Sequence, residues 1–555
     1  MINSLYFLIF YSLLHFHGRG ILILLDKLIP NIGLLNYRIQ KFPIVLLSPL
    51  FSLFYIGQIV LIANFFTGSN NIVVYIISLF PVTANFYKGK YKFKFEKIEI
   101  VLLRILTIII IGFSSNTITF HQDAASYHLN TQLFIRTEKI VLGLANVYVR
   151  YGYSSLSDYI SSIFWVDNNF IFLHFLNLVF ISIFYIFIIW CLLESSNFRL
   201  KIMSLGLLLF GILDNFGIEG GRNGYIDIDT IGKQDNAFAI LFFLTNFFII
   251  EKIYKQEKLN KVDFFIILFL ILFSVEYRFF GLISIVGLLL LIKDNIKDYI
   301  QLDVIPFLSL GLIWVIKNYL ITSCLFYPIT FTCLPSRWRN NFISEWQSEE
   351  LRFFHSAYNI LSETPMEWYI RWSERYLNYY VSINLVISFL IVLLVLNILL
   401  IRKKKHFIKN QKIVLYLFLI FAVWLLSAPS IRFGIGIFLL FIFYFTSNFK
   451  HFRFKFVNNL FNKRYLKISV ILITIFTTPL IKNYSVENLS TSLKQITPPS
   501  IEYEQNYDTW GVSVKVSNKN EDVKFCWLNK ECTPPPNFKI IEENLYGYRL
   551  MILDN

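Results

Sequence analysis

Long apolar runs alternate with short polar segments along most of the chain. Runs of this kind predict membrane-spanning helices. Several runs are shorter than the roughly 17 residues that a span needs, so we expect those helices to extend a few residues past the apolar run. The runs cover residues 5–14, 21–35, 44–65, 72–82, 98–112, 170–193, 202–213, 237–250, 264–273, 279–292, 305–321, 381–401, 413–426, 433–445 and 470–481.

The pair of runs at 264–273 and 279–292 is short, and Glu276, Tyr277 and Arg278 stand between its two members. Two full helices are one interpretation of this pattern. A broken or re-entrant hairpin buried in protein is the other.

Basic residues cluster on one side of this alternation. Residues 88–97 hold five lysines, and further clusters lie at 199–201, 252–261, 402–412 and 450–467. Cytoplasmic loops of membrane proteins carry such an excess of Lys and Arg. The intervening segments are therefore predicted to be extracytoplasmic: 119–167, 214–236, 322–380 and the C-terminal segment 483–555.

Composition supports an all-α polytopic membrane protein, which we expect to have about 13–15 transmembrane helices. Of the 555 residues, 56% are hydrophobic and only 16% are charged, whereas soluble proteins carry roughly a quarter charged residues. The net charge of +15 does not indicate a nucleic-acid partner, because the cations lie between apolar runs. No cleavable signal peptide is expected, since residues 5–14 lack a basic segment before them and a small-residue cleavage site after them.

The polar segment that follows the run 98–112 holds one carboxylate, Asp123, between His121 and His128. A carboxylate just past a membrane span is costly unless it is solvated or used. One interpretation is a catalytic loop in which Asp123 takes a proton from an attacking hydroxyl. The residues alone support a solvated connector equally well.

Cations stand at the predicted outer ends of several spans, and each alone is typical of a side chain that snorkels to the surface. Together with the carboxylates they predict an outward polar cavity. Cations there would stabilise a phosphate leaving group, and arginine matches phosphate geometry best. The arrangement therefore suits transfer from a lipid-phosphate donor. The candidate phosphate contacts are Arg150, Lys233, Arg278 and Arg432, and Lys317 is a further candidate substrate contact.

No resident cofactor is certain from the sequence. Asp227 and Asp229 could bind a divalent cation through oxygen ligands, although carboxylates two residues apart are common in loops. The sequence contains no phosphate-loop motif, no H-E-x-x-H zinc motif and no G-x-S-x-G elbow, which argues against an ATP-driven transporter, a zinc protease and a serine hydrolase. Internal symmetry typical of a secondary transporter is also lacking.

Four of the five cysteines lie in predicted outer segments, in two close pairs. Close pairs in an oxidising compartment predict disulfides, with free thiols as the alternative. We favour Cys526–Cys532 over Cys324–Cys333, because Trp527 and three consecutive prolines indicate a compact loop around the former.

Six segments, in order, resemble a family of poorly characterised bacterial multi-pass membrane proteins. Asp123 begins the first motif, D-x-x-x-Y-H-L, which includes Tyr127 and His128. Residues 143–155 resemble that family's G-L-x-N…R-x-G-x-x-S segment, and 232–235 its turn that ends in Asp. Residues 317–328, 429–434 and 526–534 resemble its R-N…Y-P, P-x-x-R-F-G and C-W…C-T-P segments.

That family in turn is similar to the GT-C glycosyltransferases, which use polyprenyl-phosphate-linked sugars. The resemblance implies N-terminal helices at 1–97, a GT-C-like core at 98–482 and a small outer segment at 483–555. Asp123 would match the acidic residue in the first outer loop of the core. Departures from the pattern are Ala124 in place of a second acid, Cys324 in place of glycine and Gln234 in place of proline.

The resulting prediction is a glycosyltransferase of the bacterial inner membrane with an extracytoplasmic site. It would move a sugar from a lipid-linked donor to a glycan, lipid or protein acceptor. Asp123 would be the general base or orient the acceptor, and His128 would support it by hydrogen bonding or play a structural part. Tyr127 and Asp235 are added as substrate contacts.

Two other functions remain open. A glycan polymerase or ligase of the O-antigen type would tolerate loss of Asp123 but fail on loss of Arg278 or Arg432. A non-enzymatic transporter of lipid-linked glycans would need an inner-facing cavity.

Overall fold

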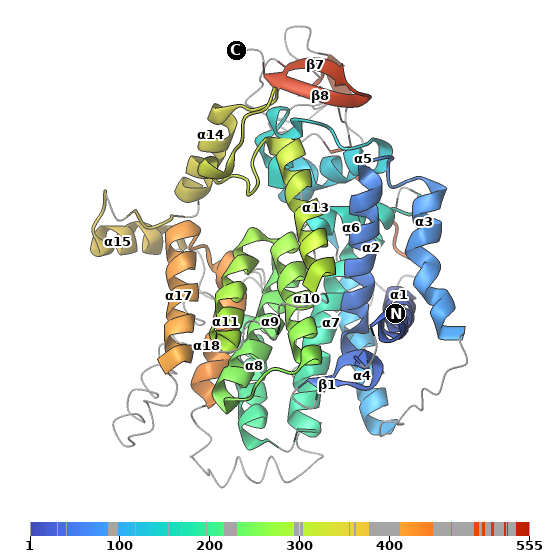
Figure 1. Ribbon diagram of the computed structural model, residues 1–555, viewed down its shortest axis with the longest axis vertical. Helices are drawn as coiled ribbons and strands as arrows, with labels where there is room; N and C mark the ends of the chain where they lie inside the picture. Colours follow the sequence, from blue (N-terminus) through green and yellow to red (C-terminus); the bar gives the residue numbers. More distant parts are fainter. Residues whose placement is uncertain are drawn as a thin grey trace.

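The structure is a computed structural model (Figure 1), and its description excludes several segments. The described residues are 2–29, 32–39, 42–86, 98–116, 118–153, 155–167, 169–195, 197–215, 230–232, 234–293, 299, 304–354, 356–359, 362–376, 411–447, 468, 493–498, 502–505, 512–515, 527–528, 530 and 540–553. The predicted spans 381–401 and 470–481 and the lysine-rich segment 88–97 lie outside them.

A bundle of helices forms most of the described chain. The α-helices are α1 (Ile2–Leu28), α2 (Ser48–Asn64), α3 (Ile72–Leu79), α4 (Ile98–Gly112), α5 (Leu129–Thr137), α6 (Leu156–Ile163), α7 (Ile171–Leu193), α8 (Phe198–Asn215), α9 (Asp235–Lys255), α10 (Lys261–Tyr277), α11 (Ile283–Ile292), α13 (Ile305–Thr322), α14 (Asn341–Phe354), α15 (Pro365–Tyr376), α17 (Gln411–Ser427) and α18 (Ile431–Ser447).

Strands are short and come in pairs. They are β1 (Arg38–Ile39) with β2 (Phe42–Pro43), β3 (Thr119–Phe120) with β4 (Thr230–Ile231), β5 (Glu502–Gln505) with β6 (Val512–Lys515), and β7 (Ile540–Leu545) with β8 (Tyr548–Leu553). All pairs are antiparallel except β3–β4, which is parallel.

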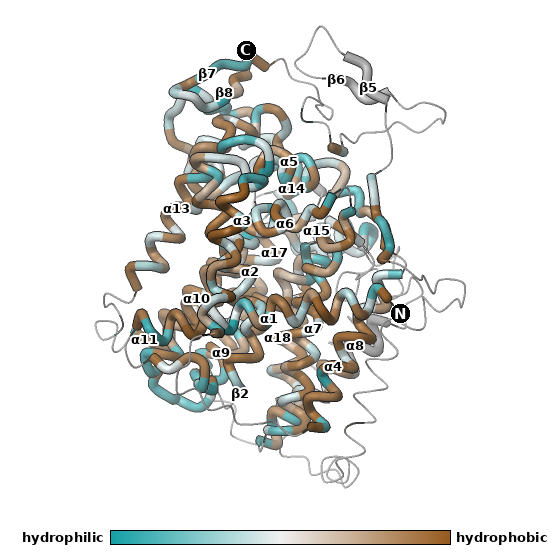
Figure 2. Tube along the Cα trace, turned by 90° about the vertical axis from the view of Figure 1, so that its right-hand side faces the viewer, coloured by the Kyte–Doolittle hydropathy of each residue, from teal (hydrophilic) through white to brown (hydrophobic). Residues whose placement is uncertain are grey.

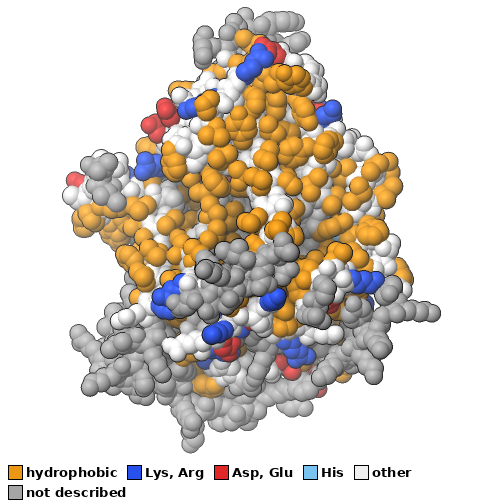
Figure 3. Space-filling model, in the orientation of Figure 1, with side chains coloured by type: hydrophobic (Ala, Val, Ile, Leu, Met, Phe, Trp, Pro, Cys, Tyr) orange, Lys and Arg blue, Asp and Glu red, His pale blue; other side chains and the backbone are white. Residues whose placement is uncertain are grey.

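The structure confirms a helical, multi-pass membrane protein. Six described segments are long and apolar enough to cross a membrane, and four shorter apolar helices accompany them. Hydrophobic residues follow the helices, hydrophilic ones gather mainly at their ends (Figure 2), and hydrophobic side chains cover much of the face in Figure 3. The six are α1, 44–64, 98–116, α7, α9 and α13.

The run expected at 5–14 and the first half of the run at 21–35 form one helix, α1, so that prediction of two spans was wrong. His17 breaks the apolar pattern between them, but its ring nitrogens lie 2.7 Å from both the Ser52 hydroxyl and the Ser78 carbonyl oxygen. Gly18 and Gly20 let α1 approach other backbone closely, because a Cβ at either would lie less than 2 Å from a carbonyl oxygen. Contacts with other helices therefore satisfy polar residues whose pattern in the sequence resembles a loop.

The short pair at 264–273 and 279–292 forms two helices joined by a tight turn. α10 is 17 residues long, and a short 3₁₀ turn leads from it into α11. Arg278 stands at the junction, directly after the last residue of α10.

The bundle has two polar ends with different chemistry. At one end, Arg199 pairs with Glu251, and the Lys252 ammonium lies 2.6 Å from a carboxylate oxygen of Asp263. The other end receives the start of α9, the end of α10, the start of α18 and the segment 119–167. Helices α14 and α15 and the hairpin β7–β8 also lie toward this second end (Figure 1).

The hairpin β7–β8 packs on the segment 138–146. The backbone N–H groups of Leu142 and Met551 donate to the carbonyls of Arg549 and Leu142, at 2.8 and 2.9 Å. Both guanidinium contacts of Arg549 to Glu138 measure 2.8 Å. The C-terminal hairpin is therefore part of the layer that covers the second end of the bundle.

The disulfide of the described chain joins Cys324 and Cys333, the pair that the sequence placed second. It lies in the same buried cluster as Tyr151, Leu550 and Met551. The favoured pair, Cys526 and Cys532, lies outside the described residues.

Candidate functional site

Asp123 stands between strand β3 and a π-helical turn at Ala124–His128. The π-turn is rare and is found often at functional sites. Strand β3 is fixed beside β4, and the His121 N–H donates to the Ile231 carbonyl at 2.9 Å. Residues more than a hundred positions apart thus set the position of Asp123.

Gly232 allows the segment that follows β4 to contact Ala124 closely. A Cβ at Gly232 would lie 2.4 Å from the Ala124 Cβ, and the residue also has φ +85°. Gly547 has a similar φ of +83°, but nothing lies within 4 Å of its Cβ position. We expect Gly547→Ala to cost only the backbone strain, about 1 kcal/mol.

Gly232→Ala adds overpacking to that strain, about 1–3 kcal/mol more. Thermal unfolding of both variants in the same detergent measures the difference. Equal unfolding temperatures for the two variants would contradict the close contact between residues 232 and 124.

Two arginines and two carboxylates meet at the second end of the bundle. The Arg432 Nη2 lies 3.0 Å from Asp123 Oδ2, and its Nε lies 2.7 Å from Asp235 Oδ2. The Arg278 Nη2 lies 2.6 Å from Asp235 Oδ1. We call these four residues the arginine–carboxylate cluster. Asp235 is the buried anchor that holds both arginines.

Asp123 is held in its ionised form. Burial opposes ionisation of its carboxyl, but the contact with His121 and the charge of Arg432 outweigh burial and hold the pKa well below its usual range. The Nδ1 of His121 lies 3.3 Å from Asp123 Oδ2. A carboxylate held this firmly is a weak base for as long as His121 and Arg432 stay beside it.

The guanidinium groups of the cluster keep capacity for a further ligand. The side chains of Arg278 and Arg432 are 31% and 30% exposed, against 2% for Asp235. Among the described residues, no hydrogen-bond acceptor meets the buried Nη1 of Arg278. The guanidinium of Arg278 also lies over the Phe433 ring, 4.3 Å from its centroid. This arrangement fits an anionic ligand with several oxygens.

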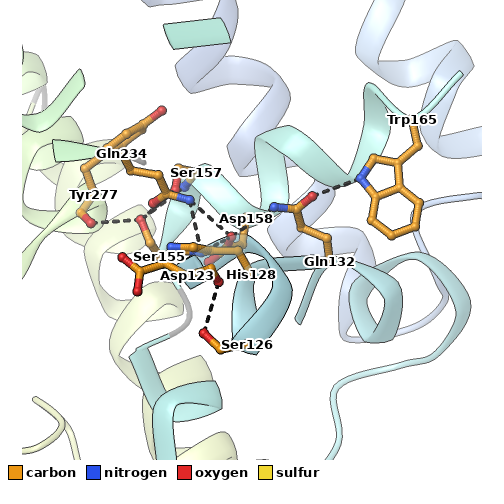
Figure 4. A network of polar contacts seen from close by, with 10 residues as sticks. All are labelled: Asp123, Ser126, His128, Gln132, Ser155, Ser157, Asp158, Trp165, Gln234 and Tyr277. Atoms are coloured by element: carbon orange, nitrogen blue, oxygen red, sulfur yellow. Dashed lines mark hydrogen bonds and ion pairs between the residues drawn. The ribbon is translucent and has the colours of Figure 1, made fainter. Parts of the chain in front are cut away.

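A second polar network lies next to the cluster and centres on Asp158 (Figure 4). Asp158 Oδ1 lies 2.9 Å from His128 Nδ1 and accepts hydrogen bonds of 3.2 Å from Gln132 and Gln234. Gln234 immediately precedes Asp235, so this network supports the anchor of the arginine–carboxylate cluster through the backbone.

The structure pairs His128 with Asp158, and His121 takes the place beside Asp123 that the sequence analysis gave to His128. Asp158 was not among the predicted site residues. Its one signal was Ser155, whose side chain caps α6 by accepting from the Ser157 N–H. A serine followed three residues later by an acid indicates a helix start. This pattern therefore gave no reason to assign Asp158 a further role.

Lys317 is fully buried and belongs to the surroundings of Asp158 rather than to the cluster. Its ammonium lies 5.7 Å from the centroid of the Tyr159 ring and 5.2 Å from that of Trp314. The carboxyl groups of Glu276 and Asp158 are close enough to act on its charge.

Two other predicted substrate contacts, Arg150 and Tyr127, lie around the arginine–carboxylate cluster. Arg150 pairs with Glu350 on α14 at 2.8 Å. Tyr127 packs edge-on against Tyr153, with ring centroids 6.1 Å apart. Tyr127 is also close enough to Asp123 and Arg432 for their charges to act on it, and burial, the larger effect, raises the pKa of its hydroxyl well above the ordinary value.

Several predictions cannot be placed, because Lys233, Asp227 and Asp229 lie outside the described residues. Within the described chain, no group of three or more His, Cys, Asp or Glu side chains could hold a metal ion.

Comparison with known proteins places the chain in a family. A family model described as "Domain of unknown function (DUF8201)" matches residues 5–439. No curated protein and no solved structure matches the chain. The match covers the arginine–carboxylate cluster and the Asp158 network, so both lie within the family region.

Proposed function

Since the chain belongs to the family described as "Domain of unknown function (DUF8201)", which states no activity, we propose its function from the site. The protein is a membrane glycosyltransferase with a GT-C-like core. It moves a sugar from a polyprenyl-phosphate-linked donor to a glycan, lipid or protein acceptor at the cell surface. The observation that carries this proposal is the meeting of Asp123, Arg278 and Arg432 at one end of the helix bundle.

The reaction assigns one task to each kind of group. The acceptor hydroxyl oxygen attacks the anomeric carbon, and the bond from that carbon to the phosphate oxygen breaks. The phosphate leaves on the lipid with the bonding electrons, and Arg278 and Arg432 stabilise its charge. Asp123 receives the proton of the acceptor hydroxyl.

The pairing of Arg432 with Asp123 gives the reaction an order. A donor phosphate competes with the Asp123 carboxylate for the same guanidinium. When Arg432 turns to the phosphate, Asp123 loses one of the neighbours that hold its pKa low, and the pKa rises while the contact with His121 remains. Asp123 therefore becomes a better base only when the donor is in place, which protects the site from unproductive proton transfer.

The distribution of charge supports an extracytoplasmic site. Lys252 and Arg199 lie at the end of the bundle opposite to the cluster, and basic residues gather on the cytoplasmic side. In this orientation the cluster, the disulfide and the hairpin β7–β8 all face the outside of a bacterial inner membrane. A disulfide is stable in that compartment.

Ligand stabilisation tests donor recognition without knowledge of the acceptor. We expect undecaprenyl phosphate to raise the unfolding temperature of the purified protein, and undecaprenol, which lacks the phosphate, to leave it unchanged. A ligand at a hundredfold excess over its Kd stabilises by about 2.7 kcal/mol. Arg278→Gln should lose the shift, because it removes one of the two phosphate contacts.

Arg337→Gln is the matched control, since Arg337 is 59% exposed and pairs only at the surface with Glu543. It should keep the full shift. An equal response to the phosphate and the alcohol, or a full shift in Arg278→Gln, would contradict phosphate recognition by the cluster.

A further inference from the structure

Helix α15 has three distinct faces. Its indole side chains pack inward: Trp368 donates to the Ser356 carbonyl and Trp372 to the Pro429 carbonyl, each at 2.7 Å. A second face is charged and carries Glu367, Arg371, Glu374 and Arg375. The third face is apolar and exposed, and it consists of Met366, Tyr369 and Ile370, which are 65%, 47% and 45% exposed.

The exposed apolar residues are spaced three and four positions apart, so they lie on one side of the helix. The charged face is already satisfied in part within the protein. Arg371 pairs with Glu363 at 2.8 Å, and Arg375 donates to the Phe353 carbonyl at 3.0 Å. An amphipathic helix of this pattern, with aromatic residues beside the apolar stripe, is typical of a membrane–water interface.

The position of α15 matches this pattern. In Figure 1 it projects sideways from beside the upper end of α17, and hydrophobic side chains line the lower side of this projection in Figure 3. The Tyr358 N–H donates to the Leu425 carbonyl at the end of α17, at 3.1 Å. Below that point α17 exposes Leu415 and Phe418, by 53% and 63%. The apolar stripe of α15 thus continues the exposed apolar surface of a bundle helix.

We propose that α15 is an interfacial helix that lies in the bilayer surface, with Met366, Tyr369 and Ile370 in the boundary between lipid headgroups and acyl chains. The partner of this face is the lipid bilayer itself. The inference does not depend on the proposed reaction. It does set the depth of the arginine–carboxylate cluster relative to the bilayer surface. The Trp372 indole N–H donates to the Pro429 carbonyl, and Arg432 follows Pro429 by three residues.

The test measures how deeply the helix lies in lipid. A nitroxide is attached to the full-length protein at Met366→Cys and at Ile370→Cys, in vesicles of phosphatidylcholine and phosphatidylglycerol. Its collisions with oxygen, which concentrates in lipid, are compared with those of a water-soluble nickel chelate. Glu374→Cys, on the charged face of the same helix, is the matched control, and the parent protein treated with the same reagent supplies the background.

We expect the ratio of oxygen to nickel collisions to be several-fold higher at 366 and 370 than at 374. A ratio equal to that at 374 would place the helix in water and overturn the proposal. Low collision rates with both reagents would also overturn it, because they would mean that protein covers the face. Tyr369→Cys replaces either variant that does not elute with the parent protein, so the face is tested in every case.

Discussion

Replacement of Asp123 by Asn is expected to abolish sugar transfer while the protein still inserts and folds. The two side chains have nearly the same shape, so packing around the π-turn is preserved. Asn cannot accept the acceptor proton, and loss of a positioned base typically slows a reaction 10²–10⁴-fold. The measurement is incorporation of labelled sugar from the lipid-linked pool into acceptor, in membranes that contain equal amounts of each protein.

Asp167→Asn is the control for this experiment. Asp167 lies in the same predicted outer segment but is exposed, so the same chemical change there should leave transfer intact. Full activity of Asp123→Asn would exclude Asp123 as the base. If that variant is active and Arg278→Gln is not, the polymerase or ligase becomes the better explanation, because it relies on outer Arg and His residues rather than on Asp123.

Replacement of Arg432 by Gln is expected to lower both stability and donor binding. Arg432 neutralises Asp235, whose side chain is only 2% exposed, and also contacts Asp123. Removal of one partner from a buried ion pair costs about 3–5 kcal/mol. Asp235 keeps Arg278 as a partner, so we expect a loss of about 3 kcal/mol, at the lower end of that range.

A double variant separates stability from function. Arg432→Gln combined with Asp235→Asn removes the stranded charge, and unfolding temperature should recover toward that of the parent protein. Stabilisation by undecaprenyl phosphate should stay lost, because the phosphate contact is still missing. If the double variant regains both properties, Arg432 acts only as a structural partner of Asp235, and its role in donor binding would be refuted.

Helix bounds were predictable where apolar runs end abruptly. The run 98–112 corresponds to α4 residue for residue, and the runs of α7 and α13 differ from their helices by one residue. Prediction was wrong in α1, because the polar positions around His17 look like a loop in sequence. Their partners lie on α2 and α3, which no local pattern reveals.

The sequence indicated which residues belong to the arginine–carboxylate cluster, but not how they are arranged. Alternation of spans places Asp123, Arg278 and Arg432 on one side of the membrane, and they do come together. Asp123 and Arg432 are separated by 309 positions, and no local rule links them. The sequence also could not show that His121, rather than His128, lies beside Asp123. Residues 124–128 form a π-turn, and its wider turn changes the direction in which the side chains point.

An experimental structure of the protein in a lipid disc with bound undecaprenyl phosphate tests the central claim most directly. The account predicts that the phosphate lies between the guanidinium groups of Arg278 and Arg432, and that Arg432 has moved away from Asp123. Asp123 should then face the space beside the phosphate where an acceptor hydroxyl would lie. A phosphate bound elsewhere, with the contact between Arg432 and Asp123 intact, would contradict the account.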